Sequence, residues 1–454
     1  MTAPSIDPTI PADSTDLPLV ERRAVLPAGF RAGGQAIGIK ASGRPDLALV
    51  VTTAGPAAAA AVFTPNAFAA APVLRSKANL AATSGDPRGR YGWAQAVVST
   101  SGCANAATGA AGAADQAQVG RLVAEATGVA EGHVLHLSTG IIGTRLPLER
   151  VEAGLHELAP ALRDEDDGLE AAAISLRTTD SVTKVATTTV SLDGVEVTVS
   201  GIAKGVGMIH PNMATMLSVV LTDARVEPDV LWSLLRPAAA RTWDQLSVDG
   251  DTSTNDTVFV LASGAAADAP VQAGSAAAEV LGSAIEAIGR DLARQQAADG
   301  EGATILLTAA VQGARDDAEA RAVARAVVSS SLVKTAAHGK DPNWGRVAGA
   351  AGNAVLASAA VLEAAGLSRE EAQRRGGQPV ALDPDRLRIT IAGHLVFDGA
   401  GGGPVAFDRE AARDAMDAPE LVIGLDLGEG DGRGEAFGCD LTETYVIENS
   451  EYTT

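Results

Sequence analysis

Apolar residues recur in short alternating or continuous runs along the first hundred residues, a pattern typical of β-strands. The runs are DLALVVTT (46–53), AAAVFT (59–64) and AQAVVST (94–100). They lie close together, before the first long segment with helical periodicity, AADQAQVGRLVAEAT (113–127). Strands that follow one another without a helix predict antiparallel pairing in this part of the chain.

The rest of the chain mixes helical and strand-like segments. A strand is predicted at 133–138, helices at 147–162 and 167–177, and a strand pair at 184–192 and 195–203, joined by Asp193-Gly194, which is typical of a tight hairpin turn. Further strands are predicted at 216–222, 257–263, 303–309, 386–392 and 420–426, helices at 227–241, 275–296 and 316–333, and a surface helix followed by a loop at 361–379. This order predicts a layered protein that combines antiparallel strands with packed helices.

Length, charge and cysteine content narrow the class of protein. A chain of 454 residues and 45.7 kDa has room for two or three domains. Its formal charge of −21 repels a phosphate backbone and an anionic membrane surface, so we expect neither nucleic acid nor membrane as a partner. Two cysteines, Cys103 and Cys439, fit a reducing compartment. Residues 1–23 lack the pattern of a signal or transit peptide, so we expect a flexible tail and a cytoplasmic location.

Candidate chemistry lies in GIAKGVGMIHPNMATMLSVVLT (201–222), where a loop rich in Gly and Pro leads directly into a buried strand. Thr215 stands at the entrance of that strand. One interpretation is purely structural, with Thr215 as a residue that favours β-structure. In the other, Thr215 Oγ attacks the carbonyl of Ala214, and hydrolysis of the resulting ester frees an α-amine that serves as the base for its own hydroxyl.

Long motifs across the chain resemble one known family, the ornithine acetyltransferases, also called bifunctional glutamate N-acetyltransferases. GMIHPNMATML resembles the family's self-cleavage and nucleophile motif, and DGDTSTNDT (249–257) is equally specific. The other matching segments are PAGFRAGGQAIGIKASGRPDLALV (27–50), VFTPNAF (62–68), AAPV (70–73), STGIIG (138–143), TTDS (178–181), DGEGAT (299–304), KDPNWGR (340–346), GCDLTETYV (438–446) and NSEYTT (449–454). The resemblance covers nearly the whole chain after the N-terminal tail.

The resemblance implies a precursor that is cut between Ala214 and Thr215 into an α chain (24–214 after the tail) and a β chain (215–454). It implies an α/β (α+β) fold, an αββα sandwich that resembles the N-terminal nucleophile hydrolases but has its own topology. A smaller C-terminal α/β region completes this fold. An α2β2 heterotetramer of the two chains is also implied.

The implied activity is transfer of acetyl from N-acetylornithine to glutamate through an acetyl-Thr215 intermediate, with no cofactor and no metal. The sequence leaves open whether acetyl-CoA is a second donor. Carried over by motif, Thr215 is the nucleophile, Thr139 and Gly140 form the oxyanion hole, and the substrate-binding residues are Thr178, Lys204, Thr215, Glu301, Asn449 and Thr454. Each also has a plain structural interpretation, such as a strand-end turn for Thr139 or a frayed tail for Thr454.

Several positions depart from the family pattern, among them Cys103, Ala107, Ala67 and Ile305, and the segment 361–379 resembles an insertion. These departures leave the substrate open. Cys103 replaces the usual Asn, and Ala67 and Ile305 stand where basic or polar residues are usual, so positive charge is lost near the expected substrate region. One alternative is a paralogue that acylates another amino acid or amine in specialised metabolism. Two further alternatives are an amidohydrolase and an unprocessed small-molecule-binding protein.

Overall fold

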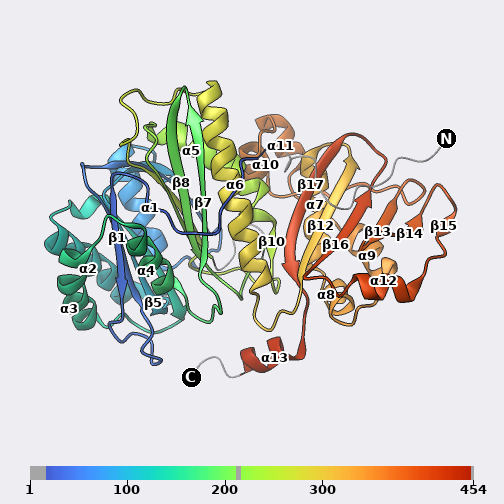
Figure 1. The fold of residues 1–454 in the computed structure, drawn as a ribbon, viewed down its shortest axis with the longest axis horizontal. Coiled ribbons are helices and arrows are strands. Elements are labelled where there is room, and N and C mark those ends of the chain that lie inside the picture. Colours follow the sequence, from blue (N-terminus) through green and yellow to red (C-terminus); the bar gives the residue numbers. More distant parts are fainter. Residues whose placement is uncertain (1–16, 211–215, 451–454) are drawn as a thin grey trace.

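The computed structural model describes residues 17–210 and 216–450 of the chain. Two regions lie side by side, a large sandwich of sheets and helices and a smaller C-terminal α/β region (Figure 1). Helix α6 (Ala276–Ala298) lies between them and packs against both. None of the described helices is long and apolar enough to cross a membrane.

The first sheet of the sandwich has six strands in the order β4-β3-β11-β9-β8-β7. Their bounds are β3 (Ala57–Phe63), β4 (Tyr91–Ala94), β7 (Lys184–Leu192), β8 (Val195–Lys204), β9 (Leu217–Thr222) and β11 (Thr257–Ala262). The central strands β9 and β11 are parallel to each other and buried along their whole length. Burial on both faces accounts for their continuous apolar sequences.

The second sheet has four strands in the order β1-β2-β5-β6. These are β1 (Phe30–Gln35), β2 (Leu47–Thr52), β5 (Ala96–Cys103) and β6 (Val134–Ile141). The predicted antiparallel pairing is confirmed for β2 and β5. The run at 59–64 instead forms part of β3, in the other sheet, where it pairs with β11 from much later in the chain.

The two sheets face each other across a shared core, and helices cover their outer faces. Phe30 and Leu137 of the four-stranded sheet share a core cluster with Val219 and Phe259 of the six-stranded sheet, whereas Val220 joins the cluster of the outer helices. The outer helices are α5 (Pro228–Arg241) and α6 on one side, and α2 (Gly109–Thr127) and α3 (Leu148–Leu158) on the other. Helices α1 (Ala71–Ser84) and α4 (Asp166–Leu176) add residues to the core between the sheets. This arrangement confirms the predicted αββα sandwich.

The C-terminal region is built on a seven-stranded sheet in the order β10-β17-β12-β16-β13-β14-β15. Its strands are β10 (Leu246–Ser247), β12 (Leu306–Ala314), β13 (Arg388–Ile391), β14 (His394–Asp398), β15 (Gly403–Pro404), β16 (Glu420–Asp426) and β17 (Gly432–Cys439). Its helices are α7 (Asp317–Ser329), α8 (Ser331–His338), α9 (Trp344–Ala351), α10 (Ala359–Ala364), α11 (Arg369–Arg375), α12 (Arg409–Ala415) and α13 (Glu443–Ser450). The smaller C-terminal α/β region is therefore present, as predicted.

Local sequence signals account for several element boundaries. The hairpin between β7 and β8 turns at Asp193 and Gly194, with φ angles of 51° and 88°, as a two-residue turn with both φ positive requires. The predicted helix 316–333 is confirmed except that it is interrupted at Ser330. Ser330 ends α7 and begins α8, because its backbone leaves the helical region and its hydroxyl accepts a hydrogen bond from Val333 N.

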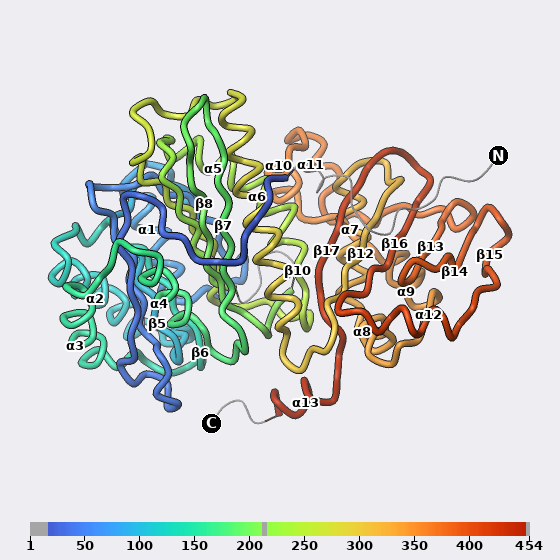
Figure 2. Tube along the Cα trace, in the orientation of Figure 1, coloured from blue at the N-terminus to red at the C-terminus, as the bar shows by residue number. Residues whose placement is uncertain are grey.

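The end of the predicted tail (1–23) lies against the six-stranded sheet (Figure 2). Glu21 and Thr187 of β7 exchange two backbone hydrogen bonds of 2.8 Å, and Arg22 pairs with Asp291 of α6 at 2.9 Å. These residues are therefore held by the sandwich. Residues 1–16 of the predicted tail are outside the described part of the chain.

Candidate active site

A pocket of about 100 Å³ opens at the end of the sandwich where β6 and β8 finish. Six of the predicted site residues line it, and they come from distant parts of the sequence: Thr139, Gly140, Thr178, Lys204, Glu301 and Asn449. Ala214, Thr215 and Thr454, the other three predicted residues, lie outside the described residues. Leu217, two positions after Thr215, pairs with Lys204 across β8 and β9.

The strand end of β6 supplies Thr139 and Gly140. Thr139 is buried, and its Oγ1 lies 3.3 Å from Lys204 Nζ. Gly140 has a φ of 126°, and a Cβ there would lie 2.3 Å from the carbonyl carbon of Gly102 on β5. Only glycine allows this close approach of two backbones. The turn therefore presents a hydroxyl and a backbone N–H at the same strand end.

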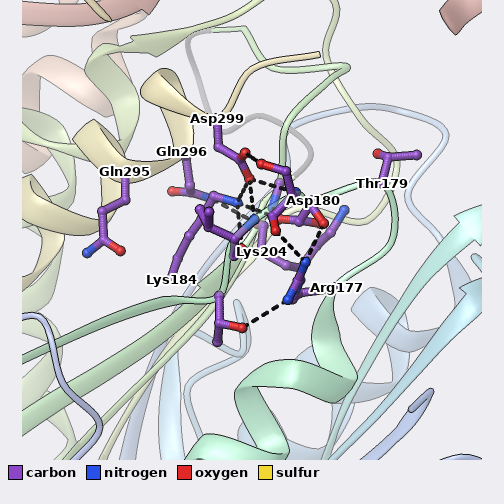
Figure 3. Close-up of polar contacts among 12 residues, drawn as sticks. Arg177, Thr179, Asp180, Lys184, Lys204, Gln295, Gln296 and Asp299 are labelled. Atoms are coloured by element: carbon purple, nitrogen blue, oxygen red, sulfur yellow. Dashed lines mark hydrogen bonds and ion pairs between the residues drawn. The ribbon is translucent and has the colours of Figure 1, made fainter. Parts of the chain in front are cut away.

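Buried charges surround Lys204. Asp180 accepts hydrogen bonds from Lys184 Nζ at 2.8 Å and from the backbone N–H of Gly205 at 2.8 Å (Figure 3). A second carboxylate, Asp299, accepts from Lys184 Nζ at 2.5 Å. Burial favours the neutral form of Asp180, but the positive charges of Lys204 and Lys184 outweigh it and hold the pKa of Asp180 below its usual value.

Lys204 has no carboxylate in hydrogen-bond contact among the described residues, although it is only 3% exposed. Burial lowers its pKa, against the opposing attraction of Asp180. Its carbonyl oxygen accepts from Gln296 Nε2 at 2.8 Å, which ties this strand end to α6. The ammonium group is thus fixed in the pocket and is available to a ligand carboxylate.

Glu301 also lines the pocket. Its two carboxylate oxygens accept hydrogen bonds of 2.9 Å, one from Thr179 Oγ1 and one from Asn449 Nδ2 of α13. A Cβ on Gly207 would lie 2.3 Å from Glu301 Oε2, so the absence of a side chain there gives the carboxylate its place. These contacts bring the C-terminal helix α13 to the pocket.

Sequence reasoning missed the roles of three residues in DGDTSTNDT, which it treated only as a family motif. Asp249 and Asp256 bind the backbone on either side of residues 211–215: Asp249 accepts from Ile209 N at 2.8 Å, and Asp256 accepts from Met216 N at 3.1 Å. Asn255 Nδ2 donates to Ala104 O and Ser138 O, each at 2.8 Å, and so joins the ends of β5 and β6. Three aspartates in one short motif were the available signal.

Asp256 is the most unusual of these groups. It is fully buried, and its Oδ2 has no hydrogen-bond partner among the described residues. Burial raises its pKa well above the usual value, although the Met216 N–H and the charge of Lys204 oppose this shift. The raised pKa means that this carboxyl group keeps its proton to a higher pH than an exposed aspartate does.

Three of the departures from the family pattern, at Cys103, Ala67 and Ile305, do not line this pocket. Ile305 is buried under Asp440, which accepts from its backbone N–H at 3.2 Å, and Cys103 Sγ lies 3.3 Å from Thr144 O. Ala67 lines a separate surface pocket beside α1. Within the described residues, no group of three or more His, Cys, Asp or Glu side chains is placed to hold a metal ion.

Comparison with known proteins identifies the family. A model of the ArgJ family matches residues 31–454. This chain belongs to the ArgJ family. The match confirms the predicted resemblance and, with it, an acetyltransferase of arginine biosynthesis.

Curated ArgJ relatives span almost the same length. The arginine biosynthesis bifunctional protein of Thermus thermophilus is 42% identical over 429 residues, which cover 94% of this chain and 99% of that protein. The chloroplastic protein of Oryza sativa is 40% identical over 442 residues, 96% of this chain and 88% of that protein. A bacterial and a plant relative thus both align with nearly the whole chain, as the motifs along it predict.

Two solved ArgJ structures are also similar. One is the Mycobacterium tuberculosis ornithine acetyltransferase complexed with ornithine, which is 39% identical, covers 42% of this chain and 97% of that chain, and gives a TM-score of 0.38. The other is the Bacillus halodurans protein, which is 34% identical, covers 50% of this chain and 95% of that chain, and gives a TM-score of 0.43.

Proposed function

We propose that this chain transfers acetyl from N-acetylornithine to glutamate through an ester on Thr215. The observation that carries the proposal is the shared pocket, in which Thr139, Gly140, Lys204 and Glu301 meet. Lys204 of this pocket pairs across β8 and β9 with Leu217, two positions after Thr215. A small amino-acid substrate suits the pocket, because Lys204 offers a cation for its carboxylate and Glu301 an anion for its amine.

Maturation precedes catalysis in this proposal. Thr215 Oγ attacks the Ala214 carbonyl carbon, the peptide C–N bond breaks, and the hydroxyl proton passes to the released nitrogen. Water then hydrolyses the ester, which leaves a carboxylate on Ala214 and a free hydroxyl and α-amine on Thr215. The products are the α chain that ends at Ala214 and the β chain 215–454, which we propose assemble as α2β2 in the cytoplasm.

The transfer itself has two halves. Thr215 Oγ attacks the acetyl carbonyl of N-acetylornithine while the α-amine takes its proton, and ornithine leaves with that proton on its nitrogen. Glutamate's α-amine then attacks the acetyl ester, and Thr215 recovers its hydroxyl. In both halves the Thr139 hydroxyl and the Gly140 N–H donate to the developing oxyanion; loss of one such donor costs about 2.7–4 kcal/mol in comparable sites.

An acceptor panel tests this function. Purified protein is mixed with N-acetylornithine and single amino acids, and the acetylated product is identified by mass spectrometry. We expect N-acetylglutamate, formed in proportion to ornithine release. Acetylation of another amino acid while glutamate is ignored would contradict the proposed acceptor, and release of acetate without any acceptor would indicate an amidohydrolase. The same assay with acetyl-CoA as donor determines whether the enzyme is bifunctional.

A further inference from the structure

A second and much larger pocket, of about 1070 Å³, lies beside the C-terminal region. Helices α7 and α9, the junction of α7 and α8, and His210 line it. It shares no residue with the lining of the candidate active site. Residues of two motifs meet here that have no role of their own in the proposed function: Asn343, Gly345 and Arg346 of KDPNWGR, and His210 of GMIHPNMATML.

The charge of this pocket is the reverse of the charge of the whole chain. Arg325 and Arg346 line it together with the half-buried His210, and none of its described lining residues is Asp or Glu. The chain as a whole carries a formal charge of −21. A positive cavity on so acidic a protein would attract small anions into this one place.

Neither arginine forms an ion pair with the described part of the chain. Arg325 Nη2 donates to Val355 O at 3.4 Å, and Arg346 Nη1 donates to Leu332 O at 2.9 Å and to Thr335 Oγ1 at 3.2 Å. No described carboxylate forms an ion pair with either of them. By contrast, Arg375 on α11 pairs with Asp316, Glu319 and Glu371.

Asp244 gives Arg325 only partial compensation for its charge. Burial lowers the pKa of Arg325, and Asp244, the carboxylate among the described residues that opposes this shift, is itself bound to Arg236 at 2.6 Å. Ser329 Oγ in the same wall is buried and has no hydrogen-bond partner among the described residues. The pocket therefore contains two guanidinium groups without a described carboxylate partner and a serine hydroxyl without a described hydrogen-bond partner.

We propose that this pocket binds a phosphate-bearing ligand of nucleotide size. Guanidinium groups bind phosphate oxygens through paired, charge-assisted hydrogen bonds, and a serine hydroxyl adds a further donor. The pocket volume is larger than a single phosphate ion requires and is close to the upper limit for small-molecule and cofactor pockets. Small residues on the walls, among them Ala322, Ala326, Gly345 and Gly349, leave this space open.

A bound ligand would contact His210, three residues after Gly207, which lines the candidate active site. Residues of one short segment, 207–210, therefore contribute to the linings of both pockets. Binding at the second pocket is nevertheless a separate property from acetyl transfer, so each can fail without the other.

Isothermal titration calorimetry on the purified full chain tests the proposal with three probes: adenosine diphosphate, inorganic pyrophosphate and glutarate. We expect saturable binding of adenosine diphosphate, weaker binding of pyrophosphate and none of glutarate. Arg325→Gln and Arg346→Gln should each weaken adenosine diphosphate binding by about tenfold or more. Arg121→Gln is the matched control, because Arg121 is exposed on α2 and its hydrogen-bond partner among the described residues is Gln118, and binding should not change.

Each arginine variant is used only if its thermal midpoint is within a few degrees of that of the wild type. Because there are two such variants, the test can still fail if one of them folds poorly. Absence of saturable binding of both phosphate probes would overturn the proposal. So would equal binding by wild type and both arginine variants, or tighter binding of glutarate than of pyrophosphate. Loss of adenosine diphosphate binding in Lys204→Met but not in the arginine variants would place the ligand in the candidate active site instead.

Discussion

Two clusters of charged side chains in this protein use the same residue types in opposite surroundings. At the candidate active site, Asp180, Lys184 and Lys204 are at most 3% exposed. On the surface of the C-terminal region, Arg375 joins Asp316, Glu319 and Glu371 in a cluster whose outer side chains, Asp316 and Glu371, are 37% and 43% exposed. Arg375 and Glu319 are largely covered, at 14% and 5%, so solvent screens the outer members of the second cluster, whereas it screens none of the first.

The difference shows what each cluster contributes. Exposed ion pairs add about 0–1 kcal/mol to stability, so the Arg375 cluster fastens α11 to α7 without strongly changing any pKa that the reaction needs. Buried charges interact strongly and shift one another's pKa values, and removal of one partner leaves the other uncompensated. The buried cluster therefore fixes the charge and position of Lys204 in the pocket, and the exposed cluster has no comparable effect.

The largest expected contrast is between two Asp→Asn substitutions, one in each cluster. Asp180 accepts from the Thr178 N–H on one oxygen and from the Gly205 N–H on the other, so Asp180→Asn keeps an acceptor for only one of them. The substitution also removes the main negative charge opposite Lys204. It should lower the free energy of unfolding by about 3–5 kcal/mol. Asp316→Asn likewise keeps the bond from Glu319 N but faces solvent, and should cost less than about 1 kcal/mol.

Thermal midpoints of the two purified variants, measured in the same buffer, check this contrast. Equal losses of stability would show that burial does not distinguish the clusters. A large loss in Asp316→Asn alone would reverse the comparison.

The next contrast concerns two lysines. Lys204→Met removes the ammonium 3.3 Å from Thr139 Oγ1 while filling similar space, and should lower kcat/KM for N-acetylornithine about 100-fold or more. Lys340→Met removes an exposed lysine that pairs with Asp417 and should leave kcat/KM unchanged. Steady-state kinetics on both variants decide the point. A Lys204→Met enzyme with wild-type kcat/KM would exclude this lysine from the site.

The smallest predicted effect depends on pH. Because burial raises the pKa of Asp256 in the folded state, the folded protein holds this proton at a pH where the unfolded chain has lost it. Its contribution to stability is therefore complete below the unfolded pKa, near 4, and is lost as pH rises toward the folded pKa. Asp256→Asn does not titrate, so relative to wild type its stability should increase with pH by at most about 1.4 kcal/mol per unit.

Thermal midpoints of wild type and Asp256→Asn at several pH values between 4 and 8 measure this change. A midpoint difference that stays constant over this range would mean that Asp256 is ionised in the folded protein, contrary to the burial argument.

The sequence predicted the elements with strong local signals and missed those that depend on tertiary contacts. The strand pair 184–192 and 195–203 agrees closely with β7 and β8, because a positive-φ turn and alternating residues define it locally. Helix α1 was not predicted, since its Ala-rich sequence has little amphipathic pattern and its position depends on packing between the sheets. The break at Ser330 was missed because the hydroxyl that caps α8 looks like any serine within a helix.

The site shows the same division. Motif resemblance selected Thr139, Lys204, Glu301 and Asn449, which the fold brings to one pocket from positions far apart in the chain. Asp180 and Asp299 both pair with Lys184, although Asp299 lies at the end of a helix far along the chain. Neither spacing nor composition predicted these contacts. Pairing between remote segments follows from the three-dimensional packing of the sheets, which local sequence does not encode.

One measurement addresses the central claim that Thr215 carries the acetyl group. The purified enzyme is mixed with N-acetylornithine alone, quenched in acid, and the intact masses of its chains are determined, followed by peptide mapping. We predict two chains, cut at Ala214/Thr215, with one acetyl group on the β chain at Thr215 that disappears when glutamate is added before the quench. A single uncut chain of 45.7 kDa that still transfers acetyl, or acetylation at any other residue during turnover, would contradict the account.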